Sequence, residues 1–236
     1  MRESKMRFSH NKRGIVKQLI AGCGLSPSFR IEILNGLLKL GKWLKNNECE
    51  VVVESRENLF QYINNEIAKN APIDYLEFGV YRGQSIRYWI QLNRDQNSRF
   101  IGFDSFKGLP EDWNLFTGVH PKGYLDLGGK IPEINDQRVK FIKGYFQVAL
   151  PGFLKRFNAN NRLIINIDAD LYSSTLYVLA SLNHLMSPGS IIIFGTFSSV
   201  THQFKAFTDF TKSFMRNYKL LVASDPFYSQ LAIVIV

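Results

Sequence analysis

Two carboxylates stand one residue apart near the middle of the chain, in the stretch "NIDADLYSST" (166–175). Asp168 and Asp170 follow the apolar run "RLIINI" and precede a helical pattern. A carboxylate in such a place can take up a proton, ligate a cation or cap the following helix. At the end of a strand, acids one residue apart need not share a face, which allows them two different roles. Which role applies depends on what the rest of the chain places beside them.

A second group of candidates lies around the glycine turn "EFGVYRG". Gly79 and Gly83 can let the backbone approach a ligand, although a tight strand-to-helix turn alone would also explain them. Asp104 ends the next predicted strand, and an acid there can accept hydrogen bonds from both hydroxyls of a ribose. The turn lacks the G-x-G-x-x-G pattern of dinucleotide sites. Together with Glu77, these residues predict a nucleoside-containing cofactor without a diphosphate, which S-adenosylmethionine fits.

The elements that would position these residues alternate between strands and helices. Seven short runs rich in apolar residues predict strands at 73–80, 99–104, 138–144, 162–168, 190–194, 218–224 and 230–236. Helical patterns follow most of them, and others at 14–22, 29–46 and 55–69 precede the first. The last two strands have no helix between them and should form a hairpin. We therefore expect an α/β, Rossmann-like, doubly wound sheet that is mostly parallel with an antiparallel last strand, plus N-terminal helices.

Composition sets the broader limits. With 236 residues, of which 45% are hydrophobic, the chain can bury one sizeable core. We divide it into a basic tail with N-terminal helices (1–54) and a main domain (55–236). Cys23 and Cys49 are too few for a disulfide framework, and neither an apolar run of membrane-spanning length nor a secretory signal is evident. We therefore expect a cytoplasmic protein.

The net charge of +9 fits either an anionic partner or simply a basic surface. Since no RNA-binding or DNA-binding motif accompanies the charge, no nucleic-acid partner is expected.

Four stretches carry a resemblance to a known family: "DYLEFGVYRGQSI", "GFDSFKGLPEDW", "FIKGYFQVALPGFL" and "IDADLYSSTLYVL". Together they resemble the macrocin O-methyltransferase family, often called TylF-like, among the class I S-adenosylmethionine-dependent methyltransferases, over roughly residues 55–236. The resemblance implies a seven-stranded sheet with the last strand antiparallel. It also implies methylation of a hydroxyl on a small-molecule or saccharide acceptor, usually with Mg²⁺.

The same resemblance implies a set of cofactor-binding residues. Glu77, Gly79 and Gly83 would line the methionine end of the cofactor, and Asp104 would hold the ribose, with Ser105 near the adenosine. The segment "GYF" would border the adenine. The full implied set is Glu77, Gly79, Gly83, Ser85, Asp104, Ser105, Gly144, Tyr145, Phe146 and Asp168.

For the transfer itself, Asp168 is similar to the family's metal ligand and Asp170 to its general base. The family's further metal ligands are acids after the fifth strand, but this chain has Gly195 and Thr196 there. Asp168 alone is a poor Mg²⁺ site.

Three alternatives remain open at the level of sequence. The enzyme could work without a metal, with Asp170 as the base. Asp168 could hold a metal together with Asp170, His202 or Thr196. Lastly, the protein could be a catalytically impaired member of the fold that only binds cofactor or a partner. The N-terminal helices could mediate a homodimer or lie over the acceptor site.

Overall fold

The computed structural model describes residues 26–115 and 117–236, so the predicted helix at 14–22 and Cys23 lie outside the described residues. The main sheet has the strand order β1-β9-β10-β8-β7-β2-β3-β6. Its strands are β1 (Val52–Val53), β2 (Ile73–Phe78), β3 (Arg99–Asp104), β6 (Val139–Lys143), β7 (Arg162–Ile167), β8 (Ile191–Phe194), β9 (Tyr218–Ser224) and β10 (Leu231–Ile235). The α-helices are α2 (Pro27–Asn46), α3 (Arg56–Tyr62), α4 (Gln84–Leu92), α5 (Phe146–Leu154), α6 (Tyr172–Leu182) and α7 (Gln203–Ser213).

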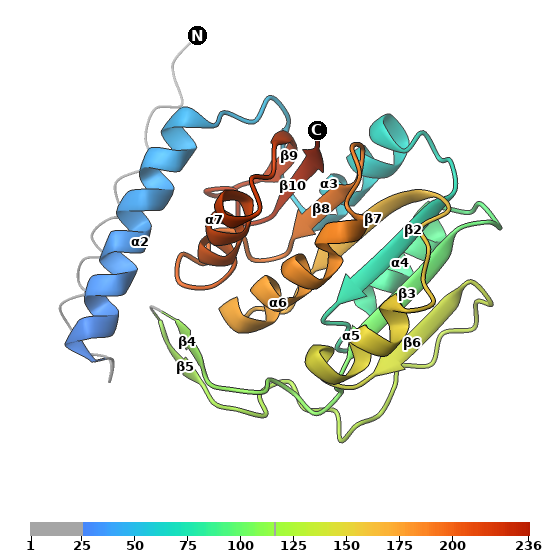
Figure 1. Ribbon diagram of the computed structural model, residues 1–236, viewed down its shortest axis with the longest axis horizontal. Coiled ribbons are helices and arrows are strands. Elements are labelled where there is room, and N and C mark those ends of the chain that lie inside the picture. The colour runs from blue at the N-terminus through green and yellow to red at the C-terminus, as the bar shows by residue number, and fades with distance from the viewer. Residues whose placement is uncertain (1–25, 116) are drawn as a thin grey trace, which may run out of the picture.

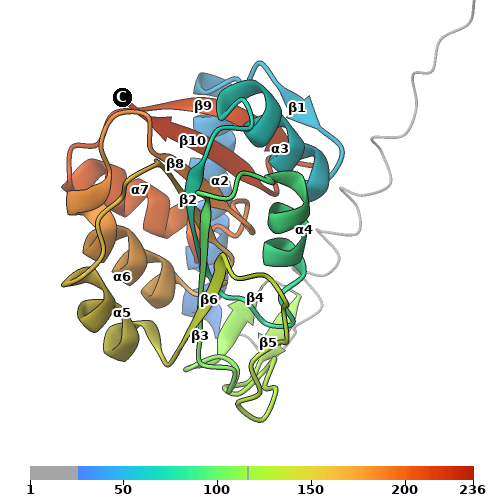
Figure 2. The ribbon, with the colours of Figure 1, turned by 90° about the vertical axis from the view of Figure 1, so that its right-hand side faces the viewer.

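Helices cover both faces of this sheet. Figure 2 shows the sheet nearly edge-on, with α5, α6 and α7 on one face and α3 and α4 on the other. The two faces have separate cores because alternate residues of a strand point to opposite sides. In β2, Phe78 packs in the core under α5 to α7, whereas Tyr75 packs in the core under α3 and α4. The doubly wound α/β prediction is therefore confirmed.

All seven predicted strands are present, and the C-terminal hairpin is as expected. β10 pairs antiparallel with both β8 and β9, while the pairs from β8 through β7, β2 and β3 to β6 are parallel. The predicted strand count is wrong by one, because Val52 and Val53 add β1 beside β9. Two residues are too few to show a strand pattern in a sequence. This contact also means that the sheet begins before residue 55.

Other predicted boundaries are also corrected. The helix expected at 55–69 is α3 followed by a π-helix, η1 (Ile63–Ile67), and a 3₁₀ turn, η2 (Asn183–Leu185), follows α6. Ser55 is the N-cap of α3, and its side chain accepts a hydrogen bond from the Asn58 backbone N–H at 3.1 Å. The long loop after β3 contains a small hairpin, β4 (Trp113–Leu115) and β5 (Gly118–His120).

The helix α2 lies against the rest of the domain through an aromatic cluster. In Figure 1 it runs along the outer side of α7. The Trp43 ring lies 5.1 to 6.4 Å from the rings of four aromatic residues: Phe197, Phe204, Phe207 and Tyr228. Phe204, Phe207 and Phe210 of α7 are buried, as expected for an apolar helix face. No helix in the described residues is long and apolar enough to cross a membrane.

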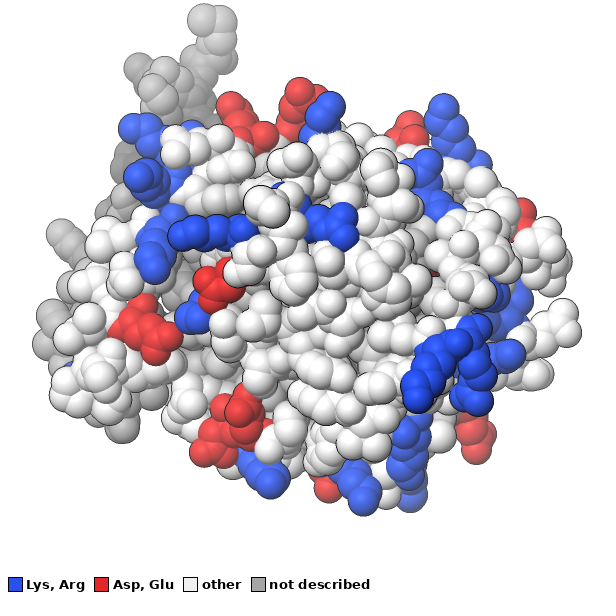
Figure 3. All heavy atoms as spheres, in the orientation of Figure 1, with Lys and Arg blue, Asp and Glu red and all other residues white. Residues whose placement is uncertain are grey.

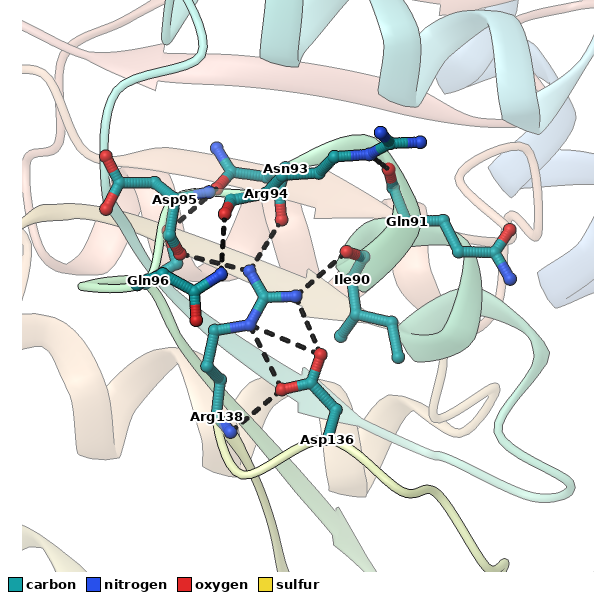
Figure 4. A network of polar contacts seen from close by, with 9 residues as sticks. Ile90, Gln91, Asn93, Arg94, Asp95, Gln96, Asp136 and Arg138 are labelled. Carbon is teal, nitrogen blue, oxygen red and sulfur yellow. Dashed lines mark hydrogen bonds and ion pairs between the residues drawn. The ribbon is translucent and has the colours of Figure 1, made fainter.

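A polar network at the amino end of β6 joins this strand to the C-terminal end of α4. Arg138, directly before β6, pairs with Asp136 at 2.7 Å and donates hydrogen bonds to the backbone carbonyls of Ile90, Asn93 and Asp95 (Figure 4). Two of these carbonyls belong to the C-terminal end of α4, where a cation is favoured by the helix dipole. The network therefore fixes the far end of the helix that begins at the glycine turn.

Basic side chains are not evenly spread over the face that Figure 3 shows. On the face in Figure 3, basic side chains group over the region where Figure 1 places α5 and β6. Exposed basic residues of that region are Lys140, Lys143, Lys155 and Arg156. The group lies around the edge strand β6 and the end of α5.

Candidate active site

A cavity opens where four parallel strands end at the same edge of the sheet. Its wall comes from the segments that directly follow β2, β3, β6 and β7, together with α3, α4 and the loop after β3. The chain leaves β2 toward β3 on one side, while β7 lies on its other side, so β2 and β7 flank the topological switch point. Ligands of open α/β sheets bind at this place. The lining residues that carry charge are Arg56, Arg82, Asp104, Asp168 and Asp170.

The glycine turn after β2 is required by the close approach of two strands. Gly79 has φ of +93°, and a Cβ there would lie 2.2 Å from the Asp168 carbonyl oxygen. Any other residue would push the ends of β2 and β7 apart at the switch point. Gly83 has φ of +75° and begins α4, but the residues that line the cavity do not include it. Gly79 therefore has a structural role in addition to any contact with a ligand.

Asp104 holds this turn in place. Its Oδ2 accepts hydrogen bonds from the backbone N–H groups of Val80 and Tyr81, both at 2.8 Å, and its Oδ1 accepts one from Phe106 at 2.7 Å. A carboxylate has about four lone-pair sites, so one remains for a ligand. Ser105 beside it donates to the Gly108 carbonyl and accepts from the Lys107 N–H. Both residues line the cavity.

The other predicted cofactor residues divide into two groups. Ser85, Gly144, Tyr145 and Phe146 all line the cavity, as the sequence predicts. Glu77 is only 1% exposed and is not among the lining residues; its Oε2 accepts a hydrogen bond from the Tyr75 hydroxyl at 2.6 Å. Burial, followed by the charge of Asp168, raises the pKa of Glu77 to about 8. Glu77 is thus mostly a neutral acid at pH 7 that lies behind the cavity wall.

Asp168 is engaged by a residue that the sequence reasoning missed. The Arg56 guanidinium binds it with two parallel contacts, Nη1 to Oδ2 at 2.7 Å and Nη2 to Oδ1 at 3.3 Å. Arg56 is the first residue of α3, and the Ser55 cap fixes the start of that helix. Both side chains are partly buried, being 30% and 21% exposed. A two-point contact of this kind fixes the orientation of both groups.

Asp170 is buried beside this pair without a hydrogen-bond partner among residues 26–115 and 117–236. It is 8% exposed, lines the cavity and has φ of +59°, a strained value for a residue with a Cβ. Burial raises its pKa to about 7, and the charge of Asp168 adds to this, while Arg56 opposes it. A carboxyl with such a pKa can take or release a proton near neutral pH.

His202, considered above as a metal ligand, already has both ring nitrogens in use. Its Nδ1 accepts from the Tyr172 backbone N–H at 3.2 Å, so the proton lies on Nε2, which donates to the Asn114 carbonyl at 2.8 Å. Burial lowers the pKa of His202. The ring therefore joins the start of α6 to β4 as a neutral group, and in this arrangement neither ring nitrogen is left to bind a metal.

The donors near Asp168 do not fit a magnesium ion. Mg²⁺ needs several oxygen ligands at octahedral positions, but both Asp168 oxygens face Arg56. Gly195 provides no side-chain oxygen, and the described residues contain no group of three His, Cys, Asp or Glu that could hold a metal. Thr196 Oγ1 is buried without a hydrogen-bond partner in the described part of the chain, and neutral hydroxyls alone do not make a magnesium site.

Comparison with known proteins agrees with this geometry. A family model described as "Methyltransferase domain" matches residues 76–195, from β2 to the end of β8. The chain belongs to this methyltransferase domain family. The match covers the strand ends that build the cavity.

Two curated relatives are similar over part of the chain. One is the 8-demethyl-8-(2,3-dimethoxy-alpha-L-rhamnosyl)-tetracenomycin-C 4'-O-methyltransferase of Streptomyces olivaceus, 30% identical over 170 residues. The other is the demethyldecarbamoylnovobiocin O-methyltransferase of Streptomyces niveus, 25% identical over 168 residues. Each alignment covers 64% of this chain, and the chain spans 63% of the length of either relative.

Among solved structures, the O-methyltransferase NovP shares the fold, with a TM-score of 0.57 and 21% identity over 75% of this chain and 77% of that one. The calicheamicin methyltransferase CalS11 covers 97% of this chain and 94% of its own, with a TM-score of 0.56 and 18% identity.

Proposed function

We propose that this protein is an S-adenosylmethionine-dependent O-methyltransferase that acts on a hydroxyl of a sugar or saccharide-containing acceptor. The observation that carries the proposal is the convergence of Asp104, Asp168 and Asp170 on one cavity at the switch point of a methyltransferase fold. The rhamnosyl group in the name of one relative's substrate favours a saccharide acceptor. Membership in the narrower TylF-like family, a cytoplasmic location and a homodimer remain predictions.

The residues present suit the cofactor. Asp104 keeps one acceptor site for a ribose hydroxyl, and Tyr145 and Phe146 offer aromatic surface for the adenine on the neighbouring strand end. Gly79 and Ser85 would border the methionine end. When bound, the cofactor supplies a methyl group: the acceptor oxygen forms the new C–O bond, and the C–S bond breaks with its electron pair on sulfur to give S-adenosylhomocysteine.

Asp170 is the residue that can take the proton of the acceptor hydroxyl. Its carboxylate lines the cavity and has no competing hydrogen bond in the described residues. Its pKa of about 7 leaves a large fraction ionised at neutral pH and still makes it a stronger base than an exposed carboxylate. The proton therefore moves from the acceptor oxygen to Asp170 and is later released to solvent.

The proposal is tested first by calorimetric titration with S-adenosylhomocysteine. We expect binding by the wild type, a loss of about 100-fold or more in Asp104→Ala, and a change below about twofold in Asp126→Ala, an exposed acid of the same loop. Thermal unfolding without ligand shows whether Asp104→Ala still folds. Methyl transfer from labelled S-adenosylmethionine is then measured on a panel of methyl glycosides and nucleotide sugars. No binding by the folded wild type would reject the function.

Cofactor binding without transfer to any member of the panel would favour the alternative, a non-enzymatic cofactor-binding or partner-binding member of the fold. The reason to keep this alternative is the absence of acids at Gly195 and Thr196. Binding together with transfer would exclude it.

A further inference from the structure

At Gly195, where the family that the sequence resembles has an acid, the space for a side chain is filled by the Asp168 carboxylate. A Cβ on Gly195 would lie 2.1 Å from Oδ1 of Asp168 and 2.8 Å from its Cγ. Real side chains do not approach so closely, so any residue other than glycine at 195 would displace the Asp168 carboxylate from its present place. The glycine at 195 and the orientation of Asp168 toward Arg56 therefore depend on each other.

Arg56 has donors left over after it binds Asp168. Its Nη1 also lies 3.5 Å from the Ser85 hydroxyl, while Nε and one N–H of Nη2 have no partner among the described residues. The guanidinium lines the cavity and is 30% exposed. An arginine keeps its charge at every pH of interest and presents its donors in a fixed plane.

We propose that the Arg56 guanidinium is the fixed cation of this active site: held by Asp168, it binds the acceptor's hydroxyl oxygen and favours loss of that proton to Asp170 without a divalent metal. This inference rests on the proposed O-methyl transfer and adds the residue that replaces the family's metal. Arg56 neither takes nor gives a proton. It stabilises negative charge on the oxygen before the new bond forms.

The turnover test compares three variants, with the acceptor found in the glycan panel. Arg56→Gln should lower kcat by about 100-fold or more, as loss of an oxyanion donor does elsewhere, with S-adenosylhomocysteine affinity within about threefold of wild type. Arg56→Lys should recover about tenfold of this loss because the charge returns without the two-point geometry. Arg94→Gln removes the same charge from an exposed position outside the cavity and should leave kcat unchanged.

The metal test needs no acceptor and uses Mn²⁺ as the probe, followed by electron paramagnetic resonance. Wild type should show no saturable site, and Thr196→Asp should show none either, because Gly195 is kept and Arg56 still holds Asp168. Gly195→Asp, Thr196→Asp and Arg56→Ala together should create a site, because Asp168 is then displaced from its present place, loses Arg56 and joins the two new acids. Turnover by the wild type should also survive EDTA and gain nothing from added Mg²⁺.

Several results would overturn the inference and leave the proposed function standing. These are one-to-one Mn²⁺ binding by wild type that Asp168→Asn abolishes, turnover that requires Mg²⁺, or full kcat in Arg56→Gln. An Arg56→Gln effect confined to cofactor affinity would also reject it, since Arg56 would then be a cofactor residue only. Failure of wild type to bind S-adenosylhomocysteine would instead reject the function itself.

Discussion

Replacing Glu77 with Gln should remove a large part of the pH dependence of stability. Glu77 lies in the middle of the sheet, 1% exposed, with its carboxyl against the Tyr75 hydroxyl. Its pKa is raised from 4.5 to about 8, chiefly by burial. The folded protein therefore binds a proton between these two values that the unfolded chain releases, and the free energy of unfolding falls as the pH rises through this window.

The size of the effect follows from the same two values. Each tenfold change in proton affinity is worth about 1.36 kcal/mol, so the shift of Glu77 corresponds to about 5 kcal/mol lost between pH 4.5 and about pH 8. Gln has nearly the same shape and can accept the Tyr75 hydroxyl hydrogen bond without an ionisable proton. We expect Glu77→Gln to resemble wild type at acid pH and to be several kcal/mol more stable above pH 8.

Urea unfolding of both proteins at a series of pH values measures this difference. Other groups such as Asp170 also titrate, but they contribute equally to both curves and cancel in the comparison. Glu133→Gln, at an exposed position, serves as the matched control and should run parallel to wild type. If Glu77→Gln also runs parallel to wild type between pH 5 and pH 8, Glu77 is not a buried neutral acid and the reasoning fails.

Three further predictions concern other parts of the domain. Since Asp170 must be ionised to act as the base, a pH-rate profile should show kcat/KM falling as the pH drops through about 7. Asp170→Asn should lower kcat by about 100-fold or more. Arg138→Ala removes the ion pair with Asp136 and the side-chain hydrogen bonds to three backbone carbonyls, so the free energy of unfolding in urea should fall by about 3 kcal/mol without a change in S-adenosylhomocysteine affinity. Gly79→Ala should lower the free energy of unfolding by about 3 kcal/mol or more, measured by thermal unfolding, because the new Cβ would clash with the Asp168 carbonyl oxygen. Gly152→Ala, where the new Cβ on α5 would meet no other atom, should not lower it.

The central, parallel part of the sheet was predictable because its strands are mostly apolar runs. "RLIINI" and "SIIIF" are buried on both faces, and such runs are typical of parallel strands between two helical layers. Val52–Val53 was missed because pairing with β9, not any local pattern, makes it a strand. The β4–β5 hairpin was missed because its short strands have mixed residues and lie in a stretch rich in turn formers.

The site was predictable only where strand order alone brings residues together. Asp104 ends β3 and Asp168 directly follows β7, the two parallel strands that flank β2, so both side chains lie at the same edge of the sheet and line the cavity. Arg56 lies 112 residues from Asp168 and precedes the first long strand, so no spacing in the sequence links them. One local signal existed: a cation at the first position of α3 opposes the helix dipole, which favours acids there. A residue in an unfavourable local position indicates a partner elsewhere in the fold.

In the sequence, the absence of acids at 195 and 196 indicates only that a metal site is incomplete. In the structure, glycine at 195 also gives the Asp168 carboxylate room to contact Arg56. Asp168 and Asp170 line one partly buried cavity, where burial and then repulsion by the charge of Asp168 raise the pKa of Asp170, while Arg56 opposes the rise. Another acid at 195 would increase that repulsion and would require a cation of higher charge. Glycine at 195 makes room for Asp168 to face Arg56, so that one positive charge lies beside the two carboxylates of the cavity. On the proposed mechanism Arg56 supplies the positive charge at this site, so the absence of acids at 195 and 196 does not by itself indicate an inactive protein.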